Sequence, residues 1–164
     1  MKYFLIFFIV ISGSISGYCQ VQSNKPGMDT SEVFMPTGFY GVESDSSNYQ
    51  IARISDNQTY YLNPDILLPV DRFEKVKTKN YRPMKMYELH IHFDSLGTIE
   101  CADVTQKYLY SRIAFIYNNK LINIPYVASP VTSGNLTFNL PNLERTEIRQ
   151  IRKGIKRAIK DKNE

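Results

Sequence analysis

One stretch of the sequence, residues 111–140, constrains the fold more strongly than any other. Its first part, Ile113–Tyr117, is apolar on both faces of a two-residue alternation, which predicts a strand covered on both sides. Asn118 and Asn119 follow, and asparagine tolerates positive φ more readily than most residues, so a tight two-residue turn is expected. Leu121–Ile124 then returns as a second strand, which ends at Pro125 because proline cannot donate to a strand ladder.

The register of this hairpin follows from the predicted turn. Phe115 would face Ile122, and Ile113 would face Ile124, giving two apolar cross-strand pairs. A third strand is expected at residues 135–140, because Ser133-Gly134 provides a turn before it.

The clearest alternation in the chain runs from Tyr87 to Asp94. The sequence predicts a strand with one covered face and one face in water. The covered face would carry Tyr87, Leu89, Ile91 and Phe93, and the wet face Glu88, His90, His92 and Asp94.

Two segments are predicted to be helices. Residues 100–110 form the first, with Thr98 as a candidate cap, and residues 143–160 form the second, with Asn142 as a candidate N-cap. The second helix carries a single apolar stripe on an otherwise charged surface, and Gly154 within it lowers the helix propensity by about 1 kcal/mol relative to alanine. The predicted fold class is therefore α+β: an antiparallel or mixed β-sheet with both helices packed on one face.

The chain before residue 64 is predicted to be organised separately. Residues 37–63 contain three short strand patterns, at 38–42, 49–55 and 59–62, which indicate a small antiparallel meander. Residues 20–36 are polar and contain Pro26-Gly27, as is typical of a flexible tether. The predicted organisation is a signal peptide at 1–19, a tether at 20–36, a β-rich extension at 37–63 and an α+β domain at 64–164.

The first 19 residues have the pattern of a secretory signal peptide. Lys2 is followed by an apolar run from Tyr3 to Ile11, which is too short to span a membrane comfortably, and then by small residues. We expect cleavage after Cys19, which places the protein in the periplasm or outside the cell. The alternative is a lipoprotein anchored to the envelope through Cys19, although Ser16 and Tyr18 depart from the usual acylation motif.

The basic character of the chain belongs to its last segment. The isoelectric point is about 9.0, but residues 144–164 alone contain eight Lys or Arg and four Asp or Glu. A helix with one isoleucine stripe is expected to pack that stripe on a sheet and leave its charges in water, rather than to bind anionic lipid or nucleic acid. No nucleic-acid partner is expected, and membrane contact is expected only if Cys19 is lipidated.

Three residues are the only candidates for chemistry. His90 and His92 share a predicted strand face and are weak candidates for metal ligands, while Cys101 lies early in a predicted helix, where the dipole lowers a thiol pKa. No catalytic or nucleotide-binding motif accompanies them, so we expect neither an enzyme nor a cofactor. The alternative is a metal- or thiol-dependent hydrolase that uses these three residues.

The same segments resemble the head subdomain in the first periplasmic domain of the SecD and SecDF export proteins. The resemblance covers about residues 65–160. Its most distinctive part is the segment RIAFIYNNKLINIP at residues 112–125. Thr105 corresponds to a threonine in the family's helix, Ser133–Thr137 to its glycine-containing turn and short strand, and residues 143–159 to its closing helix.

The departures from the family limit what the resemblance implies. The family's paired glycines correspond here to Ser133-Gly134. The chain is expected to lack the transmembrane helices and the membrane acids that couple proton flow, so motor activity is not carried over. The resemblance implies a stand-alone, non-enzymatic module that binds protein or extended polypeptide in the envelope or export machinery. Its candidate interaction surface comprises Tyr117, Asn118, Asn119, Lys120, Asn135 and Thr137.

Overall fold

The computed structural model describes residues 34–44, 49–53, 56–81 and 86–164. The predicted signal peptide, Cys19 and most of the predicted tether lie outside these residues. Within them the chain forms eight strands, two α-helices and one 3-10 turn, and the predicted α+β class is confirmed. The elements are β1 (Gly38–Glu43), β2 (Tyr49–Ala52), β3 (Thr59–Pro69), η1 (Val70–Arg72), β4 (Phe73–Tyr81), β5 (Met86–Phe93), α1 (Ser95–Lys107), β6 (Ile113–Tyr117), β7 (Lys120–Asn123), β8 (Asn135–Leu140) and α2 (Arg145–Lys162).

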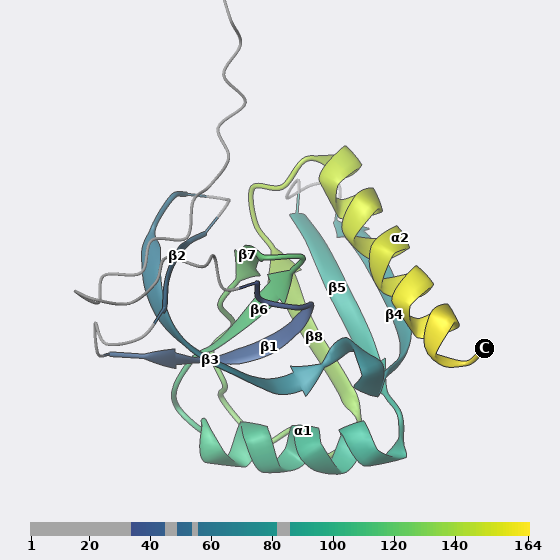
Figure 1. Ribbon diagram of the computed structural model, residues 1–164, viewed down its shortest axis with the longest axis horizontal. Coiled ribbons are helices and arrows are strands. Elements are labelled where there is room, and N and C mark those ends of the chain that lie inside the picture. Colours follow the sequence, from purple (N-terminus) through teal and green to yellow (C-terminus); the bar gives the residue numbers. More distant parts are fainter. Residues whose placement is uncertain (1–33, 45–48, 54–55, 82–85) are drawn as a thin grey trace, which may run out of the picture.

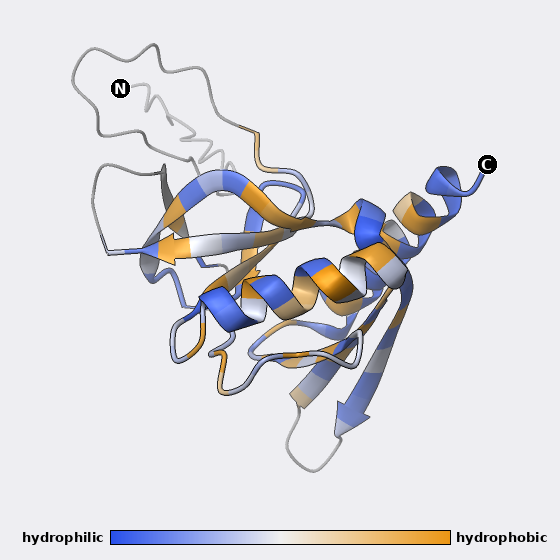
Figure 2. Cartoon of the chain, turned by 90° about the horizontal axis from the view of Figure 1, so that it is seen from below, coloured by the Kyte–Doolittle hydropathy of each residue, from blue (hydrophilic) through white to orange (hydrophobic). Residues whose placement is uncertain are grey.

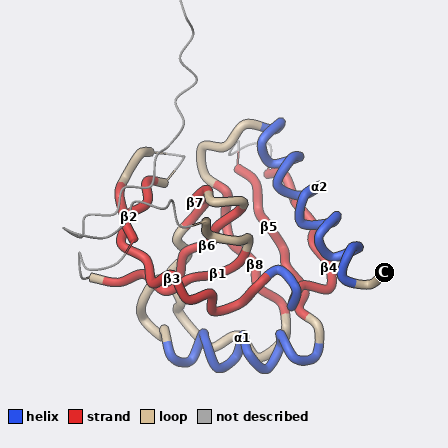
Figure 3. Tube along the Cα trace, viewed as in Figure 1, coloured by secondary structure: helices blue, strands red, loops and turns tan. Residues whose placement is uncertain are grey.

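The strands form two antiparallel sheets. The larger sheet has the order β2-β3-β1-β6-β7, and the smaller has the order β4-β5-β8. Figure 1 shows α1 below the two sheets and α2 beside β4, and Figure 3 shows both helices at the periphery with the strands between them. Both helices contribute to one core, since Cys101 of α1 and Ile148, Ile151 and Ile155 of α2 lie in the same buried cluster.

Strand β6 is covered on both faces, as predicted. Ile113 and Phe115 belong to the cluster shared with the smaller sheet and the helices. Ala114 and Ile116 belong to a second cluster on the opposite face. The larger sheet therefore separates two apolar cores, which explains why the β6 sequence shows no polar alternation.

The larger sheet curls towards closure around the second core. Arg53, directly after β2, forms a parallel bridge with Leu121 of β7, so the two outer strands of the sheet meet. The buried residues inside this curl are Met35, Tyr40, Ile51, Leu62, Ala114, Ile116, Leu121 and Ile124.

The hairpin turn is confirmed, but the predicted pairing beyond it is wrong. Tyr117 pairs with Lys120, and both turn residues have positive φ, 45° at Asn118 and 61° at Asn119. A register shift between Phe115 and Ile116 then brings Phe115 opposite Asn123 instead of Ile122. Ile122 is the extra residue at this irregularity, so Leu121 and Ile124, three residues apart, both lie in the second core, and the turn alone could not predict it.

The predicted meander is antiparallel, but its strand order is different. β3 lies between β1 and β2, and the other edge of β1 pairs with β6, with Phe39 opposite Phe115. β1 is also covered on both faces, because consecutive residues Phe39 and Tyr40 are buried in different cores. β3 crosses the predicted boundary at residue 64, which remains a prediction.

Strand β5 has the predicted two faces. Leu89, Ile91 and Phe93 are buried, whereas Glu88, His90 and His92 alternate with them on the outer face. Figure 2 shows the largely hydrophilic colouring of β4, the strand at the lower right whose arrowhead points to the grey loop at the bottom of the view.

Both helices begin at residues other than the predicted caps. α1 starts five residues earlier than predicted because Asp94, not Thr98, is its N-cap and accepts a hydrogen bond from the Gly97 amide at 2.7 Å. Glu144, not Asn142, precedes α2, and its amide donates to Glu147 Oε2 at 2.8 Å. Asn142 instead adopts φ 56° in the preceding turn.

Candidate functional site

The two histidines lie on the outer face of the smaller sheet. One ring nitrogen of His90, Nε2, lies 3.0 Å from Glu88 Oε2, and the other, Nδ1, lies 3.1 Å from Thr137 Oγ1. His92 lies beside Lys75 of β4 and Asn135 of β8. Neighbouring polar side chains of the sheet therefore engage both nitrogens of His90.

Cys101 lies on the other side of the smaller sheet. Its side chain is fully buried among apolar residues, including Leu89 and Ile91, and burial raises the pKa of its thiol to about 11. A thiolate nucleophile needs a lowered pKa and access to substrate, and this position provides neither. The structure therefore does not bring Cys101 together with His90 and His92.

The same outer face carries little that resembles a metal site. In residues 34–44, 49–53, 56–81 and 86–164, no group of three His, Cys, Asp or Glu is close enough to hold an ion. The nearest approach is the pair of Glu88 and His90. The hydrolase alternative therefore has no assembled site in the described part of the chain.

The predicted interaction residues of the hairpin turn contact the chain just before β1. Thr37 Oγ1 donates to Asn118 Oδ1 at 3.2 Å, and the Met35 amide donates to Asn119 Oδ1 at 3.1 Å. Met35 itself is 1% exposed, so ordered packing starts before Thr37, where the sequence predicted its beginning. The turn therefore fixes the N-terminal segment, while Lys120 beside it is exposed.

Tyr117 contacts α2 at Gly154. Its hydroxyl donates to the Gln150 carbonyl at 3.4 Å, and a Cβ added at Gly154 would lie 2.8 Å from Tyr117 Cζ. The helix-weakening glycine noted in the sequence therefore allows a close approach between the hairpin and α2. The sequence signal was the glycine itself, inside a strong helical pattern.

The other two predicted interaction residues lie on β8. Asn135 and Thr137 are exposed on the outer face, and β8 is an edge strand of the smaller sheet. The Asn139 carbonyl accepts a hydrogen bond from Asn123 Nδ2 at 2.6 Å. The backbone groups of Asn139 therefore point away from β5, and those of Thr137 and Asn135 point the same way, because the direction alternates along an antiparallel strand.

The two edges of the smaller sheet differ in charge. β4 carries Lys75, Lys77 and Lys79, whereas β8 has the uncharged sequence NLTFNL. Charged residues, lysine in particular, discourage another strand from pairing with an edge. β8 is the edge without this protection.

Thr105 and Gly134, both matched by the family resemblance, position the segment that leads into β8. Thr105 is buried, and its hydroxyl donates to the Cys101 carbonyl at 2.6 Å and accepts from the Val131 amide at 2.8 Å. Gly134 has φ 69° and lies against Thr98, so a side chain would be both strained and obstructed there. The sequence predicted the turn at Gly134, but it did not predict the contact of Gly134 with Thr98 or the hydrogen bonds of Thr105.

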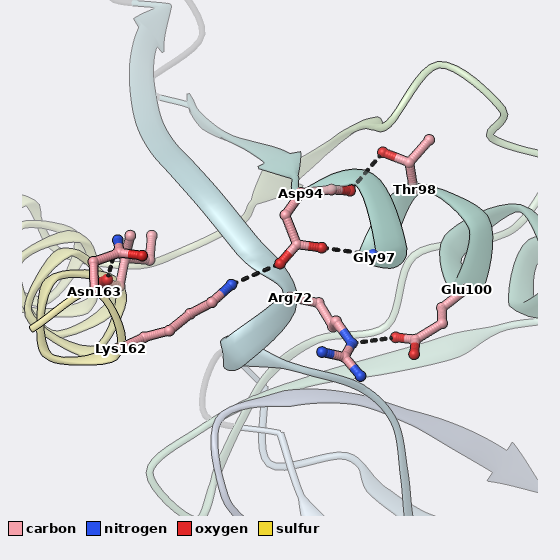
Figure 4. Close-up of polar contacts among 8 residues, drawn as sticks. Arg72, Asp94, Gly97, Thr98, Glu100, Lys162 and Asn163 are labelled. Carbon is pink, nitrogen blue, oxygen red and sulfur yellow. Dashed lines mark hydrogen bonds and ion pairs between the residues drawn. The ribbon is translucent and has the colours of Figure 1, made fainter.

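A polar junction connects β5 to both helices (Figure 4). Asp94 caps α1, and its second carboxylate oxygen accepts from Lys162 Nζ of α2 at 2.6 Å. Beside it, Arg72 of η1 donates to Glu100 of α1 at 2.7 Å. The junction holds the start of α1 and the end of α2 against the same end of β5.

Comparisons with known proteins agree with this architecture. The model of the SecDF P1 head subdomain matches residues 46–140, more than half of the chain, starting earlier and ending earlier than the resemblance indicated. A search of curated proteins gave no match. In the part of the chain that the structure describes, neither helix is long and apolar enough to cross a membrane.

Two solved structures have a similar fold. One is described as a membrane component, SecDF, that enhances protein export; it has a TM-score of 0.51 and 16% identity, over 58% of this chain and 42% of that chain. The other is SecDF in its Super-membrane-facing form, with a TM-score of 0.50 and 16% identity, over 58% of this chain and 12% of that chain. This chain therefore corresponds to less than half of either protein. Because the family model matches more than half of the chain, the chain belongs to the SecDF P1 head subdomain family.

Proposed function

We propose that this protein is a non-enzymatic export module that binds extended polypeptide along the free edge of β8. Under this proposal the signal peptide at 1–19 is removed and the remaining chain acts in the periplasm, where the export machinery supplies its partners. One observation carries the proposal: β8 is an uncharged edge strand, and its side chains Asn135 and Thr137 are exposed on the outer face of the sheet.

The backbone of β8 supplies the binding groups. Asn139 already uses its outward carbonyl to accept from Asn123, so the available stretch is the one around Asn135 and Thr137. Outside the β5 ladder, no backbone hydrogen bond of Asn135 or Thr137 is present among the described residues. An added strand would satisfy these groups with main-chain hydrogen bonds, which do not depend on the sequence of the bound chain.

The surroundings of β8 suit a partner of varied sequence. Its outward side chains lie beside His90 and His92 on a polar face, and its inward side chains, Leu136 and Phe138, are already buried in the core. A bound strand would thus meet polar groups on one face without needing a particular apolar anchor. Such a site fits a module that handles many unfolded chains.

The test removes the backbone N–H of Thr137 that points away from β5. Thr137→Pro removes this donor at an edge position where proline is tolerated, while Thr137→Val keeps both the donor and the strand preference. We expect Thr137→Pro to weaken binding of a permanently unfolded, reduced and alkylated protein by about tenfold, and Thr137→Val to leave it unchanged. Fluorescence anisotropy measures the binding, and circular dichroism confirms that both variants fold.

Amide hydrogen exchange gives an independent measurement. Bound polypeptide should slow exchange at Asn135 and Thr137 and leave β4 unaffected. The proposal fails if protection appears along β4 instead, or if Thr137→Val weakens binding as much as Thr137→Pro.

A further inference from the structure

Three arginines of α2 line one pocket, at a distance from the free edge of β8. Arg145, Arg149 and Arg152 follow one face of the helix at spacings of four and three. The pocket has a volume of about 170 Å³, and its other lining residues are Thr78, Asn80, Tyr87 and Ile148. This volume is well above the roughly 10–15 Å³ that a single water needs.

The three guanidinium groups have no carboxylate partner in the described part of the chain. The ion pairs there involve Arg53, Arg72, His90, Lys160 and Lys162 as the basic members. The described lining of the pocket contains no acidic residue. The nearest acids in sequence are Glu144 and Glu147, which bond to each other at the start of the helix through the Glu144 amide and the Glu147 carboxylate.

The strands add neutral hydrogen-bonding groups to this charge. Asn80 Nδ2 donates to Tyr87 Oη at 3.3 Å, which leaves the Tyr87 hydroxyl proton free to donate into the pocket. The Ile148 side chain is 3% exposed and gives the pocket an apolar floor. Three like charges at neighbouring positions repel one another, and a bound anion would relieve that repulsion.

We propose that this pocket binds a phosphate group. Guanidinium groups match phosphate oxygens with paired, charge-assisted hydrogen bonds, and side chains of β4 and β5 that can donate hydrogen bonds line the same pocket as Arg149 and Arg152. A phosphate could belong to an anionic lipid headgroup or to a free phosphate, and both present the same oxygens to the site. The proposal is independent of polypeptide binding at β8, since the two places share no residue.

The first test titrates the purified protein with inorganic phosphate at constant ionic strength, with chloride as the replaced ion. Nuclear magnetic resonance follows the Nε–H groups of the arginines and the side-chain amide of Asn80. We expect these signals to move along one saturable curve. The double variant Arg149→Gln/Arg152→Gln should weaken binding by about tenfold.

The matched control removes the same charge from the same helix outside the pocket. Lys153→Gln/Arg157→Gln, both at exposed positions off the stripe of Arg145, Arg149 and Arg152, should change the affinity by less than about twofold. Equal weakening by both double variants would mean that only the overall charge of α2 matters, and would overturn the site. Shifts that do not saturate would overturn it as well.

The second test distinguishes the source of the phosphate. Vesicles of phosphatidylcholine, with and without phosphatidylglycerol, are sedimented with the protein and its two double variants. Binding that requires phosphatidylglycerol and is lost in Arg149→Gln/Arg152→Gln identifies a lipid headgroup, while saturable phosphate binding without vesicle binding identifies a free phosphate. Vesicle binding that both double variants reduce equally counts against the pocket.

Discussion

The ring of Tyr117 lies against the backbone of α2 at Gly154, where any larger residue would collide with it. A Cβ at this position would lie 2.8 Å from Cζ and 2.9 Å from Cε2 of the ring. The tyrosine comes from the end of β6, so one glycine sets the distance between the larger sheet and α2. Intrinsic helix propensity and tertiary packing make opposite demands on this residue.

These opposing demands give the first prediction at this scale. Gly154→Ala improves helix propensity by about 1 kcal/mol, but crowding in a packed site costs about 1–3 kcal/mol. We therefore expect the variant to be less stable than the natural protein in urea unfolding. In a Tyr117→Leu background the obstruction is absent, so the same change should stabilise; destabilisation there as well would show that Tyr117 is not the cause.

At the scale of elements, Asp94 joins three of them. Its carboxylate caps α1 and accepts from Lys162 at the end of α2, and it directly follows β5. Burial acts to raise the pKa of Asp94, but the hydrogen bonds from Lys162 and from the Gly97 amide outweigh it and hold this pKa below its ordinary value of 3.8. The charged form is therefore favoured by folding.

Two substitutions separate the cap from the charge. Asp94→Ala removes both and should lower the free energy of unfolding by about 1 kcal/mol or somewhat more. Asp94→Asn keeps a good cap and loses the charge, at a cost of at most about 1 kcal/mol for a partly exposed pair. In urea unfolding at neutral pH, the natural protein should be the most stable, Asp94→Asn less stable and Asp94→Ala the least stable.

The lowered pKa also predicts a pH dependence. The stability from the Asp94 charge is present above pH 3.8 and is lost as the pH falls through the lower, folded-state pKa. The stability difference between the natural protein and Asp94→Asn should therefore shrink on acidification below about pH 4. A difference that stays constant with pH would mean that the Lys162 contact does not stabilise the charged form.

At the scale of the molecule, β1 is the strand that makes the larger sheet continuous. It pairs with β3 on one side and β6 on the other, and Phe39 contacts Phe115 with ring centroids 5.0 Å apart. Without β1, strand β6, whose residues contribute to both cores, would lose the strand that pairs with it on this side. The N-terminal strands and the rest of the chain therefore share both cores.

This arrangement predicts how a truncated chain behaves. We expect a fragment of residues 64–164 to lack cooperative unfolding and the dispersed amide spectrum of a packed protein, whereas residues 34–164 should show both. A fragment of 64–164 that unfolds cooperatively would support the domain boundary predicted from the sequence.

The features that the sequence could predict are those carried by local periodicity. The two faces of β5, the double coverage of β6 and the isoleucine stripe of α2 all follow from alternation or helical spacing. The place of β1 between β3 and β6 could not be predicted, because no pattern within Gly38–Glu43 specifies a partner far along the chain. The register shift between Phe115 and Ile116 places both Leu121 and Ile124 in the second core, so it too is a tertiary property.

In the candidate site, too, local periodicity predicted some features, whereas tertiary packing decided the others. The exposure of Asn135 and Thr137 could be anticipated from strand alternation, and the structure places both on an edge strand. The interaction surface at Asn118 and Asn119 stays a prediction; the hydrogen bonds of their side chains to Thr37 and Met35 are tertiary contacts that the sequence did not predict. The three-arginine pocket needed the placement of α2 beside β4 and β5, which helical periodicity alone does not provide.

The long-range pairing of β1 has a consequence for the order of events during folding. Thr37 and Asn118, which bond to each other, are 81 residues apart in sequence. Pairings at such separation carry a large loop-closure entropy before they gain any contact, and chains that depend on them fold slowly. A chain that emerges N-terminus first would leave the edge of β1 that pairs with β6 unpaired until the β6–β7 hairpin has been synthesised. During that interval the protein is itself an unfolded polypeptide with an open strand, and so briefly resembles the partners that we propose it binds.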